Sequence, residues 1–433
     1  MSLLKAEPAM AGFKRQPGQI LVIFMLVLIG LLSFAALAID GGLILLDRRA
    51  SQNGADGASL AGAGSAAQYL DQNHITWTSF HCADPIMTSV FDSAYTAALT
   101  QAANSGYHGL LNNLSTQNGV EVTCVEDAPH YEKYIDVRTM ITTSVVTSFA
   151  RILIPGDIQN TVASTARIHP RTELGFGSGV TALSGGCGGS GGLNFNGTGS
   201  VQIDGEAYSN SCIDALGAVT VSAAGGMDYL NGLSLDPLSS FSPYPVNGTA
   251  PMPVQSVPAP DCGGGAAAAS LGGGTIGPGI YSAIQLSSGS LILQPGLYCL
   301  IGDVDIQGGS VSGSGVTFYL ERNGLADTAF TISTSATVDL SAPVLGSRAG
   351  LLIQMEPGNR GAVTLRGSGP STYSGTVFAP DGNLTLESSA GASPAFRIYA
   401  AAGKVILNAG DTLGIHPAGV QPYMRSPTLD LRD

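Results

Sequence analysis

Acidic and basic side chains in the second half of the chain are of the types that could catalyse the cleavage of a glycan. Asp303 and Asp305 are two positions apart in a short apolar run, so a strand would place both carboxyl groups on one face. Glycoside hydrolysis usually needs two such groups around the scissile bond. Lyase chemistry would need a base beside calcium-binding acids, and the candidate bases are Arg366, Arg397 and Lys404.

The remaining acids of this region are scattered, and they do not form a motif with these bases. They include Asp339, Asp381 and Glu387. We therefore interpret Asp303 and Asp305 as solvated outward positions. The sequence predicts no catalytic residue, and we expect the protein not to be an enzyme.

Six cysteines are the next residues whose type carries chemistry. They fall into a pair and a group of four: Cys82 and Cys124, then Cys187, Cys212, Cys262 and Cys299. None belongs to a C-x-x-C pair, so neither a zinc ribbon nor a thioredoxin-like motif has support. An even count indicates disulfides in an oxidising compartment. Pairing of neighbours along the chain is our hypothesis (Cys82–Cys124, Cys187–Cys212 and Cys262–Cys299), although spacing does not fix connectivity and unpaired cytosolic thiols are the alternative.

Metal and cofactor sites have no clear signal in the sequence. Four histidines lie in the first third of the chain: His74, His81, His108 and His130. A zinc site needs three or four converging ligands, and we interpret these histidines as surface residues. The glycine-rich run 185–192 lacks the strand–loop–helix context of a phosphate-binding loop. We predict no metal and no cofactor.

Composition limits the classes of partner. The chain has 433 residues, 11% of them charged, with 59 glycines, four lysines and a net charge of −13. Nucleic acid binding requires a concentrated basic surface, so we predict no nucleic acid partner. Low charge with abundant glycine and short β-branched runs is typical of an extracellular β-structure.

The element that must position everything else is the uncharged stretch Ile20–Ile39. Twenty residues in a helix span roughly 30 Å, the thickness of a bilayer's hydrocarbon core. A permanent single-pass anchor is the favoured interpretation. A cleaved signal peptide, with its small residues at Ala36 and Ala38, and a prepilin-type leader ending at Gly18 are the alternatives. All three export the bulk of the chain.

A run of small residues follows the apolar stretch. Gln52, Ala55 and Ser59 recur at helical spacing, and Gln52 and Asp56 have an i, i+4 relation. A helix face of small residues lets a neighbouring element approach its backbone closely. We predict that Gln52, Ala55, Asp56 and Ser59 contact partner helices, with an ordinary amphipathic extension of the membrane helix as the alternative.

The same region resembles a known family. The apolar helix begins after Gly18-Gln19 and ends at Asp40-Gly41, and it is followed by Gln52-x-x-Ala55-Asp56-x-Ala58-Ser59. This pattern resembles the N-terminal module of TadE/TadG-like proteins, the membrane-anchored, pilin-related components of tight-adherence (Flp) pilus assembly. The resemblance covers roughly residues 18–65. It implies a bacterial protein inserted with its N-terminus inside and its globular part in the periplasm or at the cell surface.

The residue pattern divides the rest of the chain into an α+β part and an all-β part. Residues 1–46 are expected to form a cytoplasmic stub and the transmembrane anchor, and residues 47–171 a small pilin-like α+β domain. In the latter we predict a helix within Asp84–Leu114 and strands at Val120–Val125, Tyr134–Thr142 and Val162–Ile168. Residues 172–420 contain short apolar runs every 10–13 residues, separated by Gly, Ser, Asn and Pro. They predict a right-handed β-solenoid, with a β-sandwich as the alternative.

Two segments of the C-terminal part are expected to lie outside its regular strands. Residues 235–275 are rich in proline and glycine, which oppose regular ladders. They predict an excursion over the surface, pinned by Cys262, or else a linker between two β domains. Residues 421–433 are expected to form a C-terminal tail.

Together these observations predict a membrane-anchored, non-enzymatic component of Flp pilus assembly. It would sit in the bacterial inner membrane as a single-pass protein with its N-terminus inside. Its expected partners are the lipid bilayer and other pilus-assembly or pseudopilin subunits. The alternative is a carbohydrate-binding or carbohydrate-cleaving β-helix protein, whose partners would be surface glycans.

Overall fold

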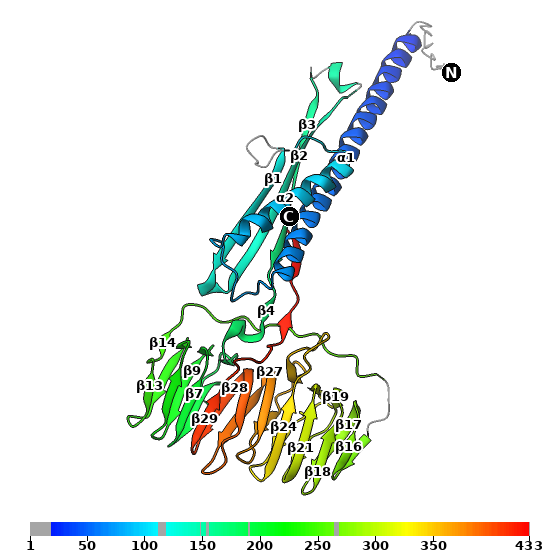
Figure 1. Ribbon diagram of the computed structural model, residues 1–433. Helices are drawn as coiled ribbons and strands as arrows, with labels where there is room; N and C mark the ends of the chain where they lie inside the picture. The colour runs from blue at the N-terminus through cyan, green and yellow to red at the C-terminus, as the bar shows by residue number, and fades with distance from the viewer. Residues whose placement is uncertain are drawn as a thin grey trace, which may run out of the picture.

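The computed structural model describes residues 19–110, 118–147, 149–152, 156–188, 191–263 and 268–432. A long helix and a small sheet form a stalk, and a stack of short strands forms a head across one end of the stalk (Figure 1). The prediction of an apolar N-terminal helix followed by an α+β part and a strand-rich C-terminal part is confirmed.

The stalk is built on α1 (Gln19–Gln72), a single helix of 54 residues. A helix of that length extends about 80 Å. The expected domain boundary between residues 46 and 47 therefore lies inside one continuous helix. From Asp40 onward α1 packs against other elements, chiefly α2 (Ile86–Asn104) and the sheet of the stalk.

The stalk sheet has four antiparallel strands in the order β1-β2-β3-β31. Their bounds are β1 (Gly119–Asp127), β2 (Glu132–Val145), β3 (Ile158–His169) and β31 (Thr428–Arg432). The first three are the predicted strands, each longer by a few residues. The fourth comes from the segment predicted as a C-terminal tail, and it forms an edge strand on β3. Beside it, β30 (Met424–Arg425) pairs with β4 (Thr172–Glu173), so two strands connect stalk and head.

Small residues let the second half of α1 lie against the sheet. Ala55, Ala58, Ala63 and Ala66 are fully buried in the cores between α1, α2 and the sheet. Bulkier side chains such as Leu70, Met87 and Ile135 fill the space toward the head. The stalk core therefore combines small residues on one face of α1 with larger side chains from α2, the sheet and the last turns of α1.

The head contains short strands that pair only in parallel with one another. Its first six strands are β5 (Val180–Ala182), β6 (Gly192–Gly197), β7 (Ser200–Ile203), β8 (Ala207–Ser209), β9 (Cys212–Leu216) and β10 (Thr220–Ala223). Strand β5 pairs with β8, β6 with β9 and β7 with β10. Each strand thus lies beside the one three further along the chain.

Pairing of each strand with the third strand further along the chain continues through most of the head. One set runs through β11 (Met227–Tyr229), β12 (Gly232–Leu235), β13 (Ser240–Ser242) and β14 (Val246–Asn247). A second set runs through β15 (Ala268–Leu271), β16 (Gly274–Ile276), β17 (Gly279–Leu286), β18 (Ser290–Leu293), β19 (Gly296–Leu300), β20 (Val304–Ile306) and β21 (Gly309–Ser314). It ends with β22 (Val316–Leu320), β23 (Phe330–Ile332), β24 (Ala336–Ser341), β25 (Leu351–Met355), β26 (Ala362–Leu365), β27 (Thr372–Ser388), β28 (Ala395–Ala409) and β29 (Thr412–Ile415).

The first and last strands of the head are neighbours. Strand β28 pairs with β5 and β6, and β29 pairs with β7. The chain therefore enters the stack near its middle, builds toward β13 and β14, and starts again at β15 and β16 at the opposite end. It returns to the middle at β28 and β29, which is why green and red strands lie side by side in Figure 1.

The proline-rich segment connects the two ends of the stack. Strands β13 to β16 occupy part of the predicted irregular region 235–275, and residues 248–263 are its described stretch without strands. Met252 and Val257 are buried against Leu351 and Phe378 of the head. The Cys262–Cys299 disulfide ties the end of this stretch to β19. The expected excursion over the surface is thus a strap along one face of the stack.

Candidate functional site: the membrane-proximal stalk

The part of α1 that precedes Asp40 is an apolar and largely exposed surface. Among the described residues, α1 is the helix long and apolar enough to cross a membrane, and its most apolar window has a mean hydropathy of 3.0 with no residue buried. Exposed leucines continue beyond the predicted span, at Leu43, Leu45 and Leu46. The helix has the length and composition of a single-pass anchor.

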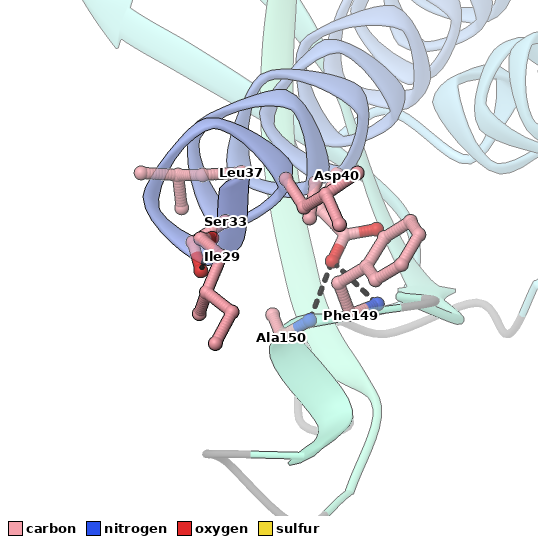
Figure 2. Close-up of a pocket in the computed structure, with 8 residues that line it drawn as sticks. Ile29, Ser33, Leu37, Asp40, Phe149 and Ala150 are labelled. Atoms are coloured by element: carbon pink, nitrogen blue, oxygen red, sulfur yellow. Dashed lines mark hydrogen bonds between the residues drawn. The ribbon is translucent and has the colours of Figure 1, made fainter. Parts of the chain in front are cut away.

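Asp40 interrupts this surface, and its carboxylate is covered by the β2–β3 hairpin. The residue is 1% exposed. Its Oδ2 accepts hydrogen bonds from the backbone N–H groups of Phe149 (2.8 Å) and Ala150 (2.5 Å), as Figure 2 shows. A buried charge is costly unless hydrogen bonds compensate it. The hairpin therefore makes an acidic residue tolerable within an apolar run.

A groove of about 520 Å³ lies where the hairpin meets the helix. Its lining residues are Ile29, Leu32, Ser33, Ala36, Leu37 and Asp40 of α1 together with Phe149 and Ala150. The Ser33 hydroxyl is used within the helix, because it donates to the Ile29 carbonyl at 2.8 Å. Apart from Asp40, the groove is thus bounded mainly by apolar side chains.

A second acidic residue joins α1 to both long strands two turns further along. The Thr143 hydroxyl of β2 donates to Asp47 at 2.5 Å, and the Asn160 amide of β3 donates to the same oxygen at 3.1 Å. Asp40 and Asp47 are seven positions apart, so they lie on the same face of the helix. These two carboxylates hold the hairpin against α1 at the end where the packed half begins.

Of the four residues predicted to contact partner helices, Gln52, Ala55 and Ser59 contact other elements of the chain's own stalk. The Ser59 hydroxyl donates to the Ser164 carbonyl of β3 at 3.0 Å, and Ala55 is fully buried. The Gln52 amide donates to Asp56 at 2.8 Å and to the Ala163 carbonyl at 3.3 Å. The small residues thus allow a close contact with β3 of the same molecule, and contact with a partner helix stays a prediction.

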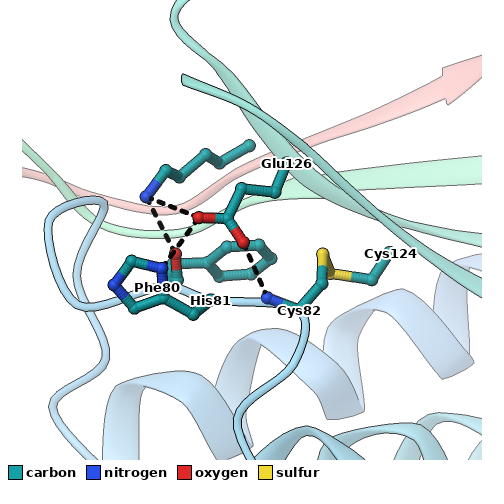
Figure 3. Close-up of a disulfide and its surroundings, with 6 residues drawn as sticks. Phe80, His81, Cys82, Cys124 and Glu126 are labelled. Atoms are coloured by element: carbon teal, nitrogen blue, oxygen red, sulfur yellow. Dashed lines mark hydrogen bonds and ion pairs between the residues drawn. A yellow bond between two sulfur atoms is a disulfide. The ribbon is translucent and has the colours of Figure 1, made fainter.

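The disulfide at the far end of the stalk sheet has a charged neighbour (Figure 3). Cys82 and Cys124 are bonded, and Glu126 accepts a hydrogen bond from the Cys82 N–H at 3.0 Å. Glu126 also lies 2.8 Å from Nδ1 of His81 and 3.3 Å from Nζ of Lys133. Burial opposes ionisation of Glu126, but these hydrogen bonds and the Lys133 charge hold its pKa below the ordinary value.

All six cysteines are paired as hypothesised. The bonds are Cys82–Cys124, Cys187–Cys212 and Cys262–Cys299. In the described part of the chain, one group of three metal-type side chains lies close together, and it consists of Cys262, Cys299 and Glu321. Because its two sulfurs are bonded to each other, this group offers no thiolate, which is the form of cysteine that binds metals.

The residues considered for glycan cleavage have separate local partners. Asp303 accepts from the Ala329 N–H at 2.8 Å, and Asp305 accepts from Gln307 at 2.9 Å. Arg366 pairs with Glu387, and Lys404 donates to the Gly188 carbonyl. Arg397 lies exposed on β28. Nothing brings these groups together as a unit among the described residues.

Sequence reasoning missed an aromatic cluster between stalk and head. The rings of Trp77, Tyr131 and Phe176 contact one another, and Tyr131 also meets Tyr208 of β8. Tyr131 and Phe176 have positive φ angles of 56° and 53°, which are uncommon for bulky residues. Burial raises the pKa of Tyr131 and of nearby Glu206. The single tryptophan of the chain was the available signal.

These features define a protein with one apolar helix that continues into an α+β stalk and a parallel-β head. Residues 18–66 match the Tad family model, described as putative Flp pilus-assembly TadE/G-like. The match confirms the resemblance drawn from the N-terminal residues, and it covers the apolar helix and most of the packed half of α1. Neither the comparison with curated proteins nor the comparison with solved structures found a match.

Proposed function

We propose that this protein is a membrane-anchored, non-enzymatic component of Flp pilus assembly that holds its head outside the cytoplasm. The observation that carries the proposal is the continuity of α1. The segment that matches the TadE/G-like model is one unbroken helix from the apolar surface into the stalk. Movement or contact at the head would therefore be transmitted to the membrane segment through a single rigid element.

The disulfides support an exported position for the stalk and the head. All three bonds lie C-terminal to the apolar surface. Disulfides persist in oxidising compartments and are rare in the cytosol of most organisms. The stalk and head would thus lie in the periplasm or at the cell surface, with the N-terminus inside and the bacterial inner membrane as the anchoring bilayer.

The head is proposed to be a right-handed β-solenoid. Pairing of each strand with the third strand along supports a coil of three strands that advances by one strand spacing per turn. Parallel crossovers in one sheet are almost always right-handed. A ladder of rings in its interior, Tyr281, Tyr298, Phe318 and Phe330, has centroids 5.0–5.8 Å apart and supports the same stacking.

The stalk sets the distance between head and bilayer. The packed part of α1 after Leu46 has 26 residues, which gives roughly 40 Å. A rigid head at that height is suited to contacts with pilus-assembly or pseudopilin subunits, and to adhesive or structural contacts in the envelope.

A complementation experiment tests the assembly role. The gene is deleted in the source bacterium, surface pili are counted by electron microscopy, and the deletion is complemented with the full chain or with Cys82→Ser/Cys124→Ser. We expect loss of pili in the deletion and recovery with the full chain. Normal piliation without the protein would contradict the assembly role, and a reduced protein in the cytosolic fraction would contradict its export.

A further inference from the structure

We propose that the tip of the β2–β3 hairpin is a second membrane contact. The tip consists, in its described part, of Val146, Phe149, Ala150 and Arg151, and the groove beside it would hold an acyl chain of a bilayer lipid. This inference rests on the proposed anchoring of α1 in a bilayer. It adds a site to that anchor, formed by residues more than 100 positions further along the chain.

The depth of the tip follows from its bond to Asp40. If Ile20–Ile39 spans the hydrocarbon core of roughly 30 Å, Asp40 lies at the boundary of one leaflet. The backbone N–H groups of Phe149 and Ala150 are bonded directly to this residue. The tip is therefore held at the same level as the end of the span.

The groove extends from that level toward the middle of the bilayer. Ile29 precedes Asp40 by 11 positions, or about 16 Å along the helix. That length corresponds to half of the hydrocarbon core. An apolar groove of this length, open beside a membrane-spanning helix, matches the acyl chain of a lipid in the same leaflet as the tip.

The exposed side chains of the tip fit an interfacial position. Val146 is 60% exposed and Phe149 is 46% exposed. Burying apolar side chains of this size in the leaflet would favour insertion. Exposed Arg151 follows directly, and exposed Arg48 and Arg49 lie two turns beyond Asp40 on α1. These three cations are placed to meet lipid phosphates while the apolar side chains enter the leaflet.

A second contact would also fix the tilt of the anchor. Membrane-spanning helices are tilted by about 20° from the bilayer normal on average. Since the hairpin lies on one side of α1, its insertion would select the direction of tilt and so orient the head.

Depth-dependent quenching in vesicles tests the proposal. Three variants of the full chain, Val146→Cys, Leu37→Cys and Leu345→Cys, each add one free cysteine to the six disulfide-bonded ones. This cysteine is labelled with an environment-sensitive dye without reduction of the native disulfides. Each is reconstituted at low protein density into phosphatidylcholine–phosphatidylglycerol vesicles. Position 37 reports the span, and position 345, which is 83% exposed in the head, reports water. Quenchers are brominated acyl chains from the lipid side and iodide from the aqueous side.

We expect the label at position 146 to lose fluorescence with brominated lipid, as at position 37, and to resist iodide. Quenching by iodide alone, as at position 345, would overturn the proposal. Protection from both quenchers would also overturn it, because protein would then occupy the site. Failure of brominated lipid to quench position 37 would instead refute the anchor itself, so the two failures are distinguishable.

A charged substitution tests the role of the tip side chain. Phe149→Asp should move the label at position 146 into reach of iodide, whereas the matched change Leu345→Asp in the head should not. An unchanged quenching profile in Phe149→Asp would show that the tip is held by protein contacts alone and would contradict insertion.

Discussion

Gly62 of α1 lies against Val137 of β2 so closely that a Cβ atom at position 62 would be 2.7 Å from the valine Cγ1. It would also approach the Ala94 carbonyl oxygen of α2 to 2.9 Å. This position therefore sets how near the long helix comes to both elements that cover it. The approach explains why small residues occupy this face of α1.

Gly62→Ala is expected to destabilise the stalk by about 1–3 kcal/mol, since a well-packed core must shift to admit the methyl group. Gly64→Ala is the matched control, because nothing lies within 4 Å of its Cβ position. Alanine is favoured over glycine in helices, so the control should be neutral or slightly stabilising. Thermal unfolding of the full chain in detergent measures both, and equal midpoints for the two variants would contradict the close approach.

Glu126 is expected to make the stability of the stalk depend on acid. Its pKa in the folded protein lies below the ordinary 4.5, so its ionised form stabilises the fold. This contribution is present above pH 4.5 and is lost as the pH falls through the lowered pKa. Buried Lys133, which also donates to the Phe80 carbonyl, would then lack its carboxylate partner.

Glu126→Gln should therefore be less stable than the parent chain at pH 7, and the difference should shrink as the pH falls below 4.5. Chemical unfolding at a series of pH values measures it. Glu121→Gln, an exposed change on the same strand, serves as the control. A stability difference between Glu126→Gln and the parent chain that stays constant at pH values well below 4.5 would mean that the carboxylate charge contributes nothing to stability.

The seam between the first and last strands of the head is expected to be sensitive to one methyl group. A Cβ at Gly199 would lie 2.1 Å from the Asp411 carbonyl oxygen, across the contact of β7 with β29. A clash with backbone must be relieved by moving one strand, which typically costs about 1–3 kcal/mol. Gly199→Ala should thus increase proteolysis near the seam. Gly185→Ala, at an open position, should not.

The sequence predicted those elements of the fold that depend on residues close together in the chain. The apolar helix, the helix α2 and the strands β1 to β3 follow from runs of residue types that lie close together in the chain. The disulfide pairing agrees with the hypothesis that neighbouring cysteines pair, which the spacing alone left open. The spacing of short apolar runs likewise indicated the repeated strands of the head.

The missed features depend on contacts between distant segments. Thr428–Arg432 pairs with β3, and β28 with β5 and β6, across more than 200 residues. Their apolar patterns would suit many partners, so local sequence cannot choose among them. For the same reason Ser59 indicated a close neighbour without indicating whether that neighbour was β3 or another molecule.

Asp40 provides the last prediction, because its role does not depend on which lipid surrounds it. Replacement by leucine removes the acceptor of two backbone N–H groups, and an unsatisfied buried donor costs about 1–3 kcal/mol. Asp40→Leu should therefore increase amide hydrogen exchange at Phe149 and Ala150 in the reconstituted protein. Asp40→Asn, which keeps a carbonyl acceptor, should raise exchange less, and Ser33→Ala, on the same helix face, should leave it unchanged. Identical exchange in all three variants would mean that contacts other than Asp40, such as those of Asp47, hold the hairpin to α1.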